Sequence, residues 1–319
     1  MPKFSIALAT CNGARYLPEL LDSLAGQALP PFEIVACDDA SSDATCCLLH
    51  DFARRAPFPV HIHKRSRALG VAGNFEDAIG KCGGEVIALA DQDDVWRADK
   101  LERLSMTLCA PEVQAVFSDA RLVDAAMVPL GYSMWERVSF TRREQHRFAS
   151  DGGFSVLLKH RVVTGATLAF KSHLRDIALP IPRDWPHDAW LAAIAAAGNP
   201  RSLVAVGEPL IAYRQHDANV VGGLRRSFFE EARTALGVDR SAWYRDEVAL
   251  WQALAERLTG RGLSVPRELD EKIAHLERRA NLPVGRWRRV PSVIRELVTG
   301  GYGNYARNWG SVAIDLLVR

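Results

Sequence analysis

The sequence predicts an α/β fold, in which a mixed, mostly parallel sheet is flanked by helices and followed by a C-terminal helical appendage. Short apolar runs alternate with helical spacing through the first 100 residues, which is typical of parallel βαβ units. Acidic clusters follow two of these runs. From about residue 225, long helical patterns rich in Arg and Glu replace the apolar runs. We therefore predict an α/β domain over residues 1–224 and a helical region over residues 225–319.

The first strands and helices are read from apolar runs and from helical spacing. The predicted strands are residues 4–9, 32–37, 60–63 and 86–90. The predicted helices span residues 15–26 and 70–81, with one between them that carries Leu48, Leu49 and Phe52. Further on, the patterns predict strands over residues 115–117 and 162–170, a helix over 188–197, a strand pair over 203–213, and helices over 230–236 and 246–258.

Composition limits the function classes that suit this chain. Of its 319 residues, 48% are apolar, which is enough for a sizeable core. The net charge is +2, so no strong positive field favours nucleic acid, and we expect no such partner. The chain enters a strand directly after Met1, and no apolar run approaches the roughly 18 residues that span a bilayer. We therefore expect a cytoplasmic protein.

The C-terminal third leaves two interpretations open. Residues 290–298 and 305–318 are amphipathic, and Trp287, Tyr302 and Trp309 are interleaved with arginines. Such a segment is typical of a helix that lies on an anionic membrane surface. The same pattern also suits a helical cap that packs on the α/β domain.

The run Asp91-Gln92-Asp93-Asp94 follows the apolar strand 86–90. Three carboxylates in four residues repel one another unless a cation or solvent intervenes. Mg²⁺ and Mn²⁺ prefer carboxylate ligands and are often shared with substrate phosphates. The alternative is a solvated acidic turn that caps the next helix, and helix capping is the default role for Asp94. Since ligands bind at the carboxyl ends of parallel strands, the position of the run favours a site.

Three further segments carry candidate chemistry. Asp38 ends the second strand, where its carboxylate suits a hydrogen bond from the imide of uracil or thymine, while Asp43 suits a helix cap. Asp188 begins a helix and suits either a general base or a helix cap. His216 follows an apolar strand and suits either a metal ligand or a structural hydrogen bond. Each segment is ambiguous when it is read alone.

Taken in order, these segments resemble the family 2 glycosyltransferases. The resemblance is carried over residues 4–222 by Ala9-Thr10-Cys11-Asn12-Gly13, Cys37-Asp38-Asp39-Ala40-Ser41-Ser42-Asp43, Gly73-Asn74-Phe75, Asp91-Gln92-Asp93-Asp94-Val95-Trp96, His187-Asp188 and Tyr213-Arg214-Gln215-His216. The last three segments and Lys100-Leu101-Glu102 are especially similar to the bacterial rhamnosyltransferase branch. Ala40 departs from the glycine usual at that position, and we expect a changed turn there without loss of activity.

The resemblance implies a GT-A fold, a nucleotide-sugar donor, a Mn²⁺ or Mg²⁺ ion and an inverting reaction. It implies that Asp93 and His216 hold the metal and that Asp188 is the catalytic base. The residues implied to bind the nucleotide sugar are Thr10, Asn12, Asp38, Asn74, Asp91 and Gln92.

The resemblance favours dTDP-rhamnose as the donor, and a glycan or lipid-linked hydroxyl as the acceptor in surface polysaccharide synthesis. Three alternatives remain. The first is the same fold with a UDP-hexose donor. The second is a sugar nucleotidyltransferase, which normally needs a Gly-rich basic loop that Thr10-Cys11-Asn12-Gly13-Ala14 does not supply. The third is a non-catalytic scaffold, for which we would expect the acidic residues to be lost.

Overall fold

The computed structural model describes residues 1–216 and 240–317. The chain divides into two compact units, residues 1–153 with 162–222 and residues 154–161 with 223–319. The predicted boundary at residues 224 and 225 lies outside the described residues, and so does the helix predicted over 230–236. All the candidate site residues belong to the first unit.

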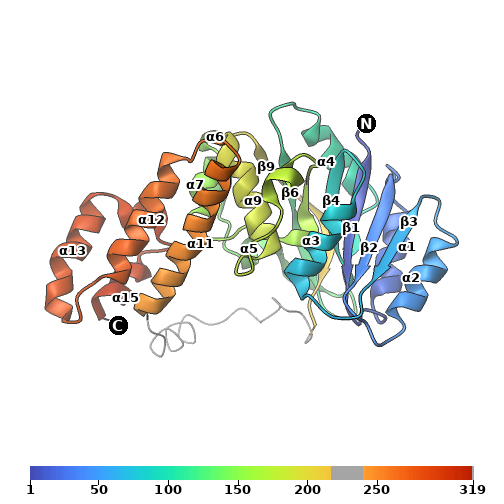
Figure 1. The fold of residues 1–319 in the computed structure, drawn as a ribbon, viewed down its shortest axis with the longest axis horizontal. Coiled ribbons are helices and arrows are strands. Elements are labelled where there is room, and N and C mark those ends of the chain that lie inside the picture. Colours follow the sequence, from blue (N-terminus) through green and yellow to red (C-terminus); the bar gives the residue numbers. More distant parts are fainter. Residues whose placement is uncertain (217–239, 318–319) are drawn as a thin grey trace. The chain divides into compact units, whose positions relative to one another are not determined.

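Nine of the described strands form one mixed sheet in the first unit (Figure 1). Four parallel strands lie in the order β3-β2-β1-β4, namely β1 (Phe4–Thr10), β2 (Glu33–Asp38), β3 (Val60–Lys64) and β4 (Val86–Asp91). The order continues β8-β6-β9-β5, with β8 (Leu168–Lys171), β6 (Ala115–Val123), β9 (Leu203–Arg214) and β5 (Val95–Trp96). The remaining strand, β7 (Pro129–Ser133), pairs with β6.

The register of the parallel strands brings two acidic segments to one edge of the sheet. Thr10 in β1 is paired with Asp38 in β2, and Ala9 is paired with Asp91 in β4. Because β2 and β4 flank β1 on opposite sides, the strand order reverses direction at β1. Ligands of open α/β sheets bind outside the carboxyl ends of the strands at such a reversal. The fold therefore places both acidic segments where a ligand site is expected.

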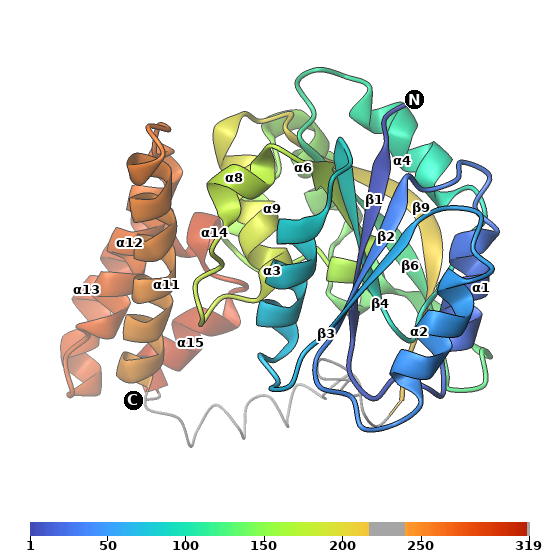
Figure 2. The same ribbon diagram turned by 45° about the vertical axis from the view of Figure 1, so that its right-hand side comes forward.

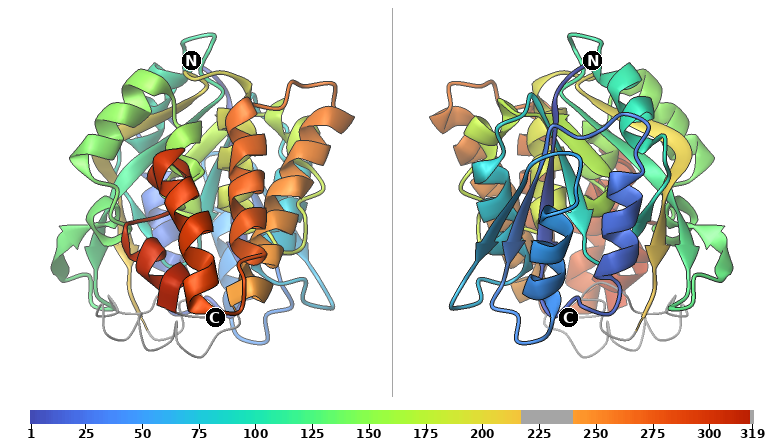
Figure 3. Two further views of the ribbon diagram at one scale, coloured as in Figure 1. Left: turned by 90° about the vertical axis from the view of Figure 1, so that its left-hand side faces the viewer. Right: turned by 90° about the vertical axis from the view of Figure 1, so that its right-hand side faces the viewer.

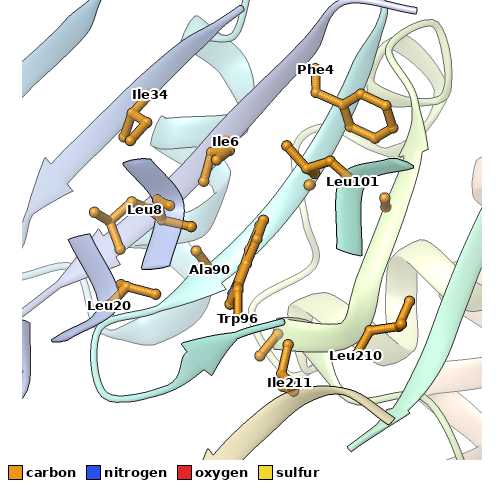
Figure 4. Close-up of a cluster of buried hydrophobic side chains, with 14 of the residues drawn as sticks. Phe4, Ile6, Leu8, Leu20, Ile34, Ala90, Trp96, Leu101, Leu210 and Ile211 are labelled. Carbon is orange, nitrogen blue, oxygen red and sulfur yellow. The ribbon is translucent and has the colours of Figure 1, made fainter. Parts of the chain in front are cut away.

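Helices cover both faces of this sheet (Figure 2). On one face lie α1 (Leu17–Ala25), α2 (Thr45–Ala53) and α4 (Lys100–Leu108), and on the other lie α3 (Val71–Lys81) and α9 (His187–Gly198). Figure 4 shows the core of the first face, where Ile6 and Leu8 of β1 meet Leu20 of α1, and Trp96 packs among them. These side chains alternate along the strand because successive strand residues point to opposite faces.

Short helices connect the remaining strands of the first unit. They are α5 (Met134–Arg137), α6 (Arg142–Asp151), the 3₁₀ turn η1 (Gly165–Thr167) and α8 (Leu174–Ala178). Helix α5 begins with a capping box, in which the Ser133 hydroxyl accepts from the backbone of Glu136 and the Glu136 carboxylate accepts from the backbone of Ser133. Such reciprocal bonds satisfy donors that a helix start leaves open.

Two element predictions were wrong. The strand predicted over residues 162–170 contains the 3₁₀ turn η1, and the strand begins only at Leu168. The strand pair predicted over 203–213 is one strand, β9, which pairs in parallel with β6 and antiparallel with β5. The pairing of β9 with β6 has register shifts near Asp119. Gly207 suggested a turn between two strands, but β9 continues through this position.

The second unit is helical. It contains α7 (Phe154–Leu157), α11 (Arg240–Gly260), α12 (Arg267–Ala280), α13 (Arg286–Val298), α14 (Gly301–Tyr305) and α15 (Gly310–Leu317). Helices α11 and α12 pack side by side (Figure 3, left). Tyr302, which the sequence groups with exposed aromatic residues, is instead buried in a small core with Val293 and Ala306. None of the helices that the structure describes is long and apolar enough to cross a bilayer.

Candidate functional site

The acidic turn leaves β4 at Asp91 and returns to the sheet at β5. It does not cap the next helix, because the residue that precedes α4 is Asp99. Asp94, for which capping was the default prediction, is fully buried, and its Oδ1 accepts from the backbone N–H of Arg214 at 3.0 Å. Trp96 is part of the hydrophobic core. The turn is therefore tied to the end of β9 rather than to a helix.

Arg214 holds the acidic turn in place. Its side chain is 1% exposed, and its Nε donates to the backbone carbonyl of Asp93 at 2.9 Å. The two terminal nitrogens of the guanidinium donate to the Ala125 carbonyl at 2.8 Å and to a Glu19 carboxylate oxygen at 2.6 Å. A buried guanidinium with several acceptors fixes the geometry around it, because its planar donors allow little adjustment. The residue thus joins β9, α1 and the acidic turn.

The same strand end delivers His216 to Asp93. The His216 Nε2 atom lies 2.8 Å from Asp93 Oδ2. The Tyr16 ring stacks at an angle on the imidazole with 4.8 Å between centroids, and the Arg214 guanidinium lies 4.5 Å from the Tyr16 centroid. The stacking of Tyr16 on the imidazole, supported by Arg214, helps to orient the imidazole. The structure therefore brings together the two residues that were predicted as metal ligands, although they are 123 positions apart in the chain.

Negative charge accumulates around this turn. Burial, followed by the charges of Asp93 and Asp188, raises the pKa of the Asp91 carboxyl to about 7, although the charge of Lys100 acts in the opposite direction. Burial and the charges of Asp93 and Asp91 also raise the pKa of Asp94. The Asp94 Oδ2 atom has no hydrogen-bond partner within the described parts of the chain. Burial and mutual repulsion therefore disfavour the charged forms of Asp91 and Asp94, and the nearby positive charge only partly offsets this.

Lys100 is a buried cation whose charge acts on Asp91 and Asp94. It is fully buried, its Nζ donates to the Ala166 carbonyl at 2.7 Å, and it lies 3.3 Å from the centroid of the Trp96 ring. Burial lowers the pKa of its ammonium group, and the charges of Asp94 and Asp91 oppose that shift. One buried lysine thus compensates only part of the acidic charge.

Asp38 organises the loop that follows β2. Its carboxylate accepts from the Thr10 hydroxyl at 3.1 Å, from the Ser41 backbone at 2.9 Å and from the Ser41 hydroxyl at 2.5 Å. Between them, Ala40 has φ +62°, a left-handed conformation that favours glycine. Ala40, which stands where the family usually has glycine, therefore adopts a backbone conformation that favours glycine.

Asn12 and Gln92 link the first loop to its neighbours. The Asn12 side-chain oxygen accepts from the Ser42 backbone at 2.9 Å. The Gln92 amide pairs with the backbone of Cys11, accepting from its N–H at 2.8 Å and donating to its carbonyl at 2.9 Å. Gly13 makes room for this pair, because a Cβ there would lie 2.1 Å from the Gln92 side-chain oxygen. Both predicted residues thus shape the loop over the strand ends.

Asn74 and Asp39 anchor the start of α3. The buried Asn74 amide donates to the backbone carbonyls of Thr10 at 3.2 Å and Cys37 at 3.0 Å. These two carbonyls lie at the carboxyl ends of β1 and β2. The Asp39 carboxylate accepts from the backbone N–H groups of Leu69 and Gly70 at 2.7 and 2.8 Å. Asn74 therefore fixes the floor of the predicted nucleotide region, and its contacts are with the protein's own backbone.

Asp188 occupies the first turn of α9. Its Oδ2 accepts from the backbone N–H of Gly165 at 3.1 Å. The preceding His187 stacks on Phe75 of α3, with 4.1 Å between ring centroids. A Cβ on Gly165 would lie 2.7 Å from His187 Nε2, so only glycine permits this close approach. Because its charge raises the pKa of Asp91, Asp188 lies within electrostatic reach of the acidic turn.

The site suits a divalent ion for which the protein supplies only some of the ligands. Within residues 1–216 and 240–317, no group of three or more His, Cys, Asp or Glu side chains is arranged to enclose a metal. Asp93 and His216 supply two adjoining ligand groups, and the next residue, Asp94, has a buried Oδ2 atom without a partner among the described residues. Mg²⁺ is usually bound by one or two carboxylates, waters and substrate phosphates rather than by a complete protein cage. The donor set is therefore compatible with a metal that is shared with a diphosphate.

The sequence interpretation gave no role to Arg214, Lys100 or Tyr16, although Arg214 and Lys100 lie within its motifs. One available signal was that Arg214 and Lys100 are charged residues next to apolar strand and helix positions, where a buried charge needs partners. Their partners are far away in sequence, as in the pair Arg214 and Asp93, and could not be identified from spacing.

Comparisons with known proteins agree with this geometry. The model of glycosyl transferase family 2 matches residues 5–164. The dTDP-rhamnosyl transferase RfbG of Shigella flexneri is 28% identical over 262 residues, which cover 78% of this chain and 85% of that protein. An uncharacterized protein of Mycobacterium tuberculosis is 26% identical over 242 residues. That match covers 71% of this chain and 63% of the mycobacterial protein, so the chain spans less than two thirds of that relative.

Solved structures of similar fold include two sugar-nucleotide complexes. Staphylococcus aureus TarS 1-349 with UDP-GlcNAc has a TM-score of 0.53 at 19% identity and covers 97% of this chain and 90% of that one. The mannosyltransferase PcManGT of Pyrobaculum calidifontis, with GDP-Man and Mn²⁺, has a TM-score of 0.52 at 20% identity and covers 99% and 85%. The predicted GT-A fold and the predicted family are both confirmed: the chain belongs to glycosyl transferase family 2.

Proposed function

We propose that this chain transfers a sugar from a nucleoside-diphosphate donor to a hydroxyl group of a glycan or glycolipid acceptor, with inversion. The observation that supports it most is the under-compensated acidic turn at the end of β4, where Asp93 meets His216 and Asp91 lies within electrostatic reach of Asp188. A divalent metal ion, shared with the donor diphosphate, would bring the positive charge that this cluster lacks. A purely structural turn would gain nothing from such an arrangement.

In this proposal Asp93 and His216 hold a Mn²⁺ or Mg²⁺ ion together with the donor diphosphate. Bound there, the ion would act as a Lewis acid that offsets the charge left on the departing phosphate. Arg214 fixes the carbonyl of Asp93 and the strand that carries His216, so the two ligand groups keep their spacing. Thr10, Asn12, Asp38, Asn74, Asp91 and Gln92 form or support the nucleotide-sugar end of the site.

Asp188 is the proposed catalytic base. Its carboxylate is held by the Gly165 N–H and by the packing of His187 on Phe75, which limits its rotation. It would accept the proton of the acceptor hydroxyl as that oxygen attacks the anomeric carbon from the face opposite the departing diphosphate. One base and one displacement invert the configuration. General-base catalysis typically contributes about 10²- to 10⁴-fold, which sets the expected effect of removing it.

Rhamnose is the favoured sugar, because RfbG, a relative that this chain matches over most of both lengths, is named as a dTDP-rhamnosyl transferase. A UDP-hexose donor is the second candidate, and the fold shared with TarS in complex with UDP-GlcNAc supports it. We further propose that the reaction takes place in the cytoplasm at the inner face of the membrane, where lipid-linked acceptors for surface polysaccharides reside.

The test is a panel of donors offered to the full chain with Mn²⁺, Mg²⁺ or a chelator. dTDP-rhamnose, UDP-glucose, UDP-GlcNAc and GDP-mannose would each be scored for hydrolysis and for a shift of the melting temperature. We expect dTDP-rhamnose to give both responses, and only with metal. A response to UDP-sugars alone would move the proposal to its second candidate. No response to any donor would refute catalysis and favour a scaffold.

Asp188→Asn separates binding from chemistry. We expect this variant to keep the donor-induced melting shift and to lose at least about 100-fold in transfer rate, since only the base is removed. Asp184→Asn, an exposed acid four residues earlier in the chain, is the matched control and should transfer at the wild-type rate. Near-normal transfer by Asp188→Asn would remove this residue from the role of base.

A further inference from the structure

Helix α13 in the second unit buries two charged residues beside Val293 and exposes apolar residues on its other side. Arg289 and Glu296 are each 4% exposed, whereas Trp287 is 89% and Val298 is 82% exposed. A surface helix of a globular protein normally shows the opposite pattern, with its apolar stripe toward the core. Packing alone therefore does not explain the exposed apolar residues of this helix.

The inward side of α13 is fixed by specific contacts. The Arg289 guanidinium donates to the backbone carbonyls of Pro283 at 2.7 Å, Val284 at 3.2 Å and Asp315 at 3.1 Å. The Glu296 carboxylate contacts His275 Nδ1 at 2.5 Å and also pairs with Arg278. Turning the helix to bury its apolar stripe would break all of these bonds. The stripe therefore faces outward because the partners of the buried residues require it.

The outward side forms one continuous apolar stripe. Trp287, Pro291, Ile294 and Val298 are spaced by four, three and four residues, which places them on the same face of a helix. All four are exposed, Ile294 by 53%. Val284, in the turn that enters the helix, is 67% exposed as well. Contiguous exposed apolar residues on a soluble protein mark an interaction site rather than chance.

The charges beside this stripe have one sign. Arg286, Arg288 and Arg295 are exposed, and the one acidic residue within α13, Glu296, is buried and paired. A helix with Trp and aliphatic residues on one face and arginines beside them is suited to the boundary between lipid headgroups and acyl chains. There the tryptophan ring prefers the interface, and arginines reach the phosphates.

We propose that the outward face of α13, defined by Trp287, Pro291, Ile294 and Val298 with Arg286, Arg288 and Arg295, docks this chain on an anionic lipid bilayer. This surface gives a physical basis to the membrane position within the proposed function, but it does not depend on the glycosyl transfer. A second copy of the chain fits the face poorly, because a symmetric contact sets the same patch against itself and would bring the arginines of both copies together. Negative lipid headgroups complement the same charges.

Vesicle flotation of the full chain tests the proposal. We expect it to float with vesicles of phosphatidylcholine and phosphatidylglycerol, and not with phosphatidylcholine alone. Raising the salt to about 1 M, where the Debye length is about 3 Å, should weaken binding strongly. The triple variant Trp287→Gln, Ile294→Gln, Val298→Gln should bind at least about tenfold more weakly, and Arg288→Gln with Arg295→Gln should do so by a similar factor.

The matched control exchanges three exposed apolar residues outside α13, in Met106→Gln, Val128→Gln and Leu263→Gln, and should float like the wild type. Melting temperatures and circular dichroism exclude unfolding of either triple variant. Wild-type protein that stays unbound with anionic vesicles would overturn the proposal. So would a triple variant that floats normally. A concentration-dependent dimer that the α13 variant abolishes, without vesicle binding, would assign the face to self-association instead. Because flotation needs no donor, its result is independent of whether the chain transfers sugar.

Discussion

The acidic turn of the first unit and the buried Asp315 of the second unit both hold carboxylates away from solvent, but they are compensated differently. Asp315 accepts from the hydroxyls of Tyr244 at 2.7 Å and Tyr302 at 2.6 Å, and from the Arg279 guanidinium at 2.6 and 3.2 Å. Asp94 receives one backbone donor, and its second oxygen has none among the described residues. One carboxylate has a full set of donors, and the other does not.

Backbone conformation separates the two regions in the same direction. The loops beside the acidic turn contain Asn12 at φ +49° and Ala40 at φ +62°. Among the described residues of α11 to α15 and their connections, the positive φ values belong to glycines. Left-handed non-glycine residues persist where other interactions over-determine them, often at functional sites. Satisfied charge and relaxed backbone thus distinguish the network around Asp315 from the acidic turn, for which we propose that a ligand completes the site.

The largest expected effect is that of Asp93→Asn on activity. The substitution removes one metal ligand and should lower the rate of transfer by about 1,000-fold or more, because Lewis-acid stabilisation is worth several kcal/mol. The melting temperature should stay within a few degrees of the wild type. Steady-state transfer and calorimetry measure the two quantities. Asp51→Asn, an exposed acid on α2, is the control and should keep full activity. Wild-type rates in Asp93→Asn would dismiss the metal-ligand role.

Paired isosteric substitutions sharpen the comparison itself. Asp315→Asn should destabilise the C-terminal helices by about 3 kcal/mol, because it leaves the buried Arg279 without its counter-ion. Asp94→Asn should leave the first unit equally or more stable, since it removes a charge that Asp91 and Asp93 repel. Differential scanning calorimetry of both variants would report this. Equal losses of stability would show that the two carboxylates are compensated alike.

The stability of the C-terminal helices should depend on pH through His275. Burial and the charges of Arg279 and Lys272 lower the pKa of this imidazole to about 4, although the hydrogen bond to Glu296 acts in the opposite direction. Between about pH 6.5 and pH 4 the unfolded chain therefore binds a proton that the folded unit does not, so the free energy of unfolding falls as the pH falls. The loss should be on the order of 3 kcal/mol and complete near pH 4.

Urea unfolding at pH 7.5 and pH 4.5 measures this effect, and His275→Gln serves as the comparison, since glutamine does not titrate. The variant should lose most of the pH dependence over that range. A wild-type protein that is equally stable at both pH values would contradict a neutral buried His275.

The smallest expected effect comes from Ala40→Gly. Relief of the left-handed conformation should stabilise the first unit by about 1 kcal/mol, partly offset by the greater freedom of glycine in the unfolded chain. Transfer activity should be unchanged, because the Asp38 contacts that surround this residue involve Thr10 and Ser41. Thermal unfolding measures the difference. A loss of stability would mean that the Ala40 methyl group makes contacts that outweigh the strain.

The sequence predicted those parts of the molecule whose signals are local. The strands of the parallel half and the acidic residues at their ends follow from short apolar runs and from what comes after them. The role of Arg214 does not, because its acceptors are the Asp93 and Ala125 carbonyls and Glu19, up to 195 residues away. Likewise, the outward stripe of α13 depends on the partners of Arg289 and Glu296, and the amphipathic pattern alone left open whether the stripe packs inward or faces outward.

Manganese binding tests the central claim, that the acidic turn is completed by a metal and a diphosphate. Free Mn²⁺ would be followed by its electron paramagnetic resonance signal during titration of the full chain with UDP or dTDP present. We predict one tightly bound Mn²⁺ per chain, with affinity at least about tenfold lower in Asp93→Asn and in His216→Gln. Equal Mn²⁺ binding by the wild type and both variants, or none by any of them, would contradict the claim.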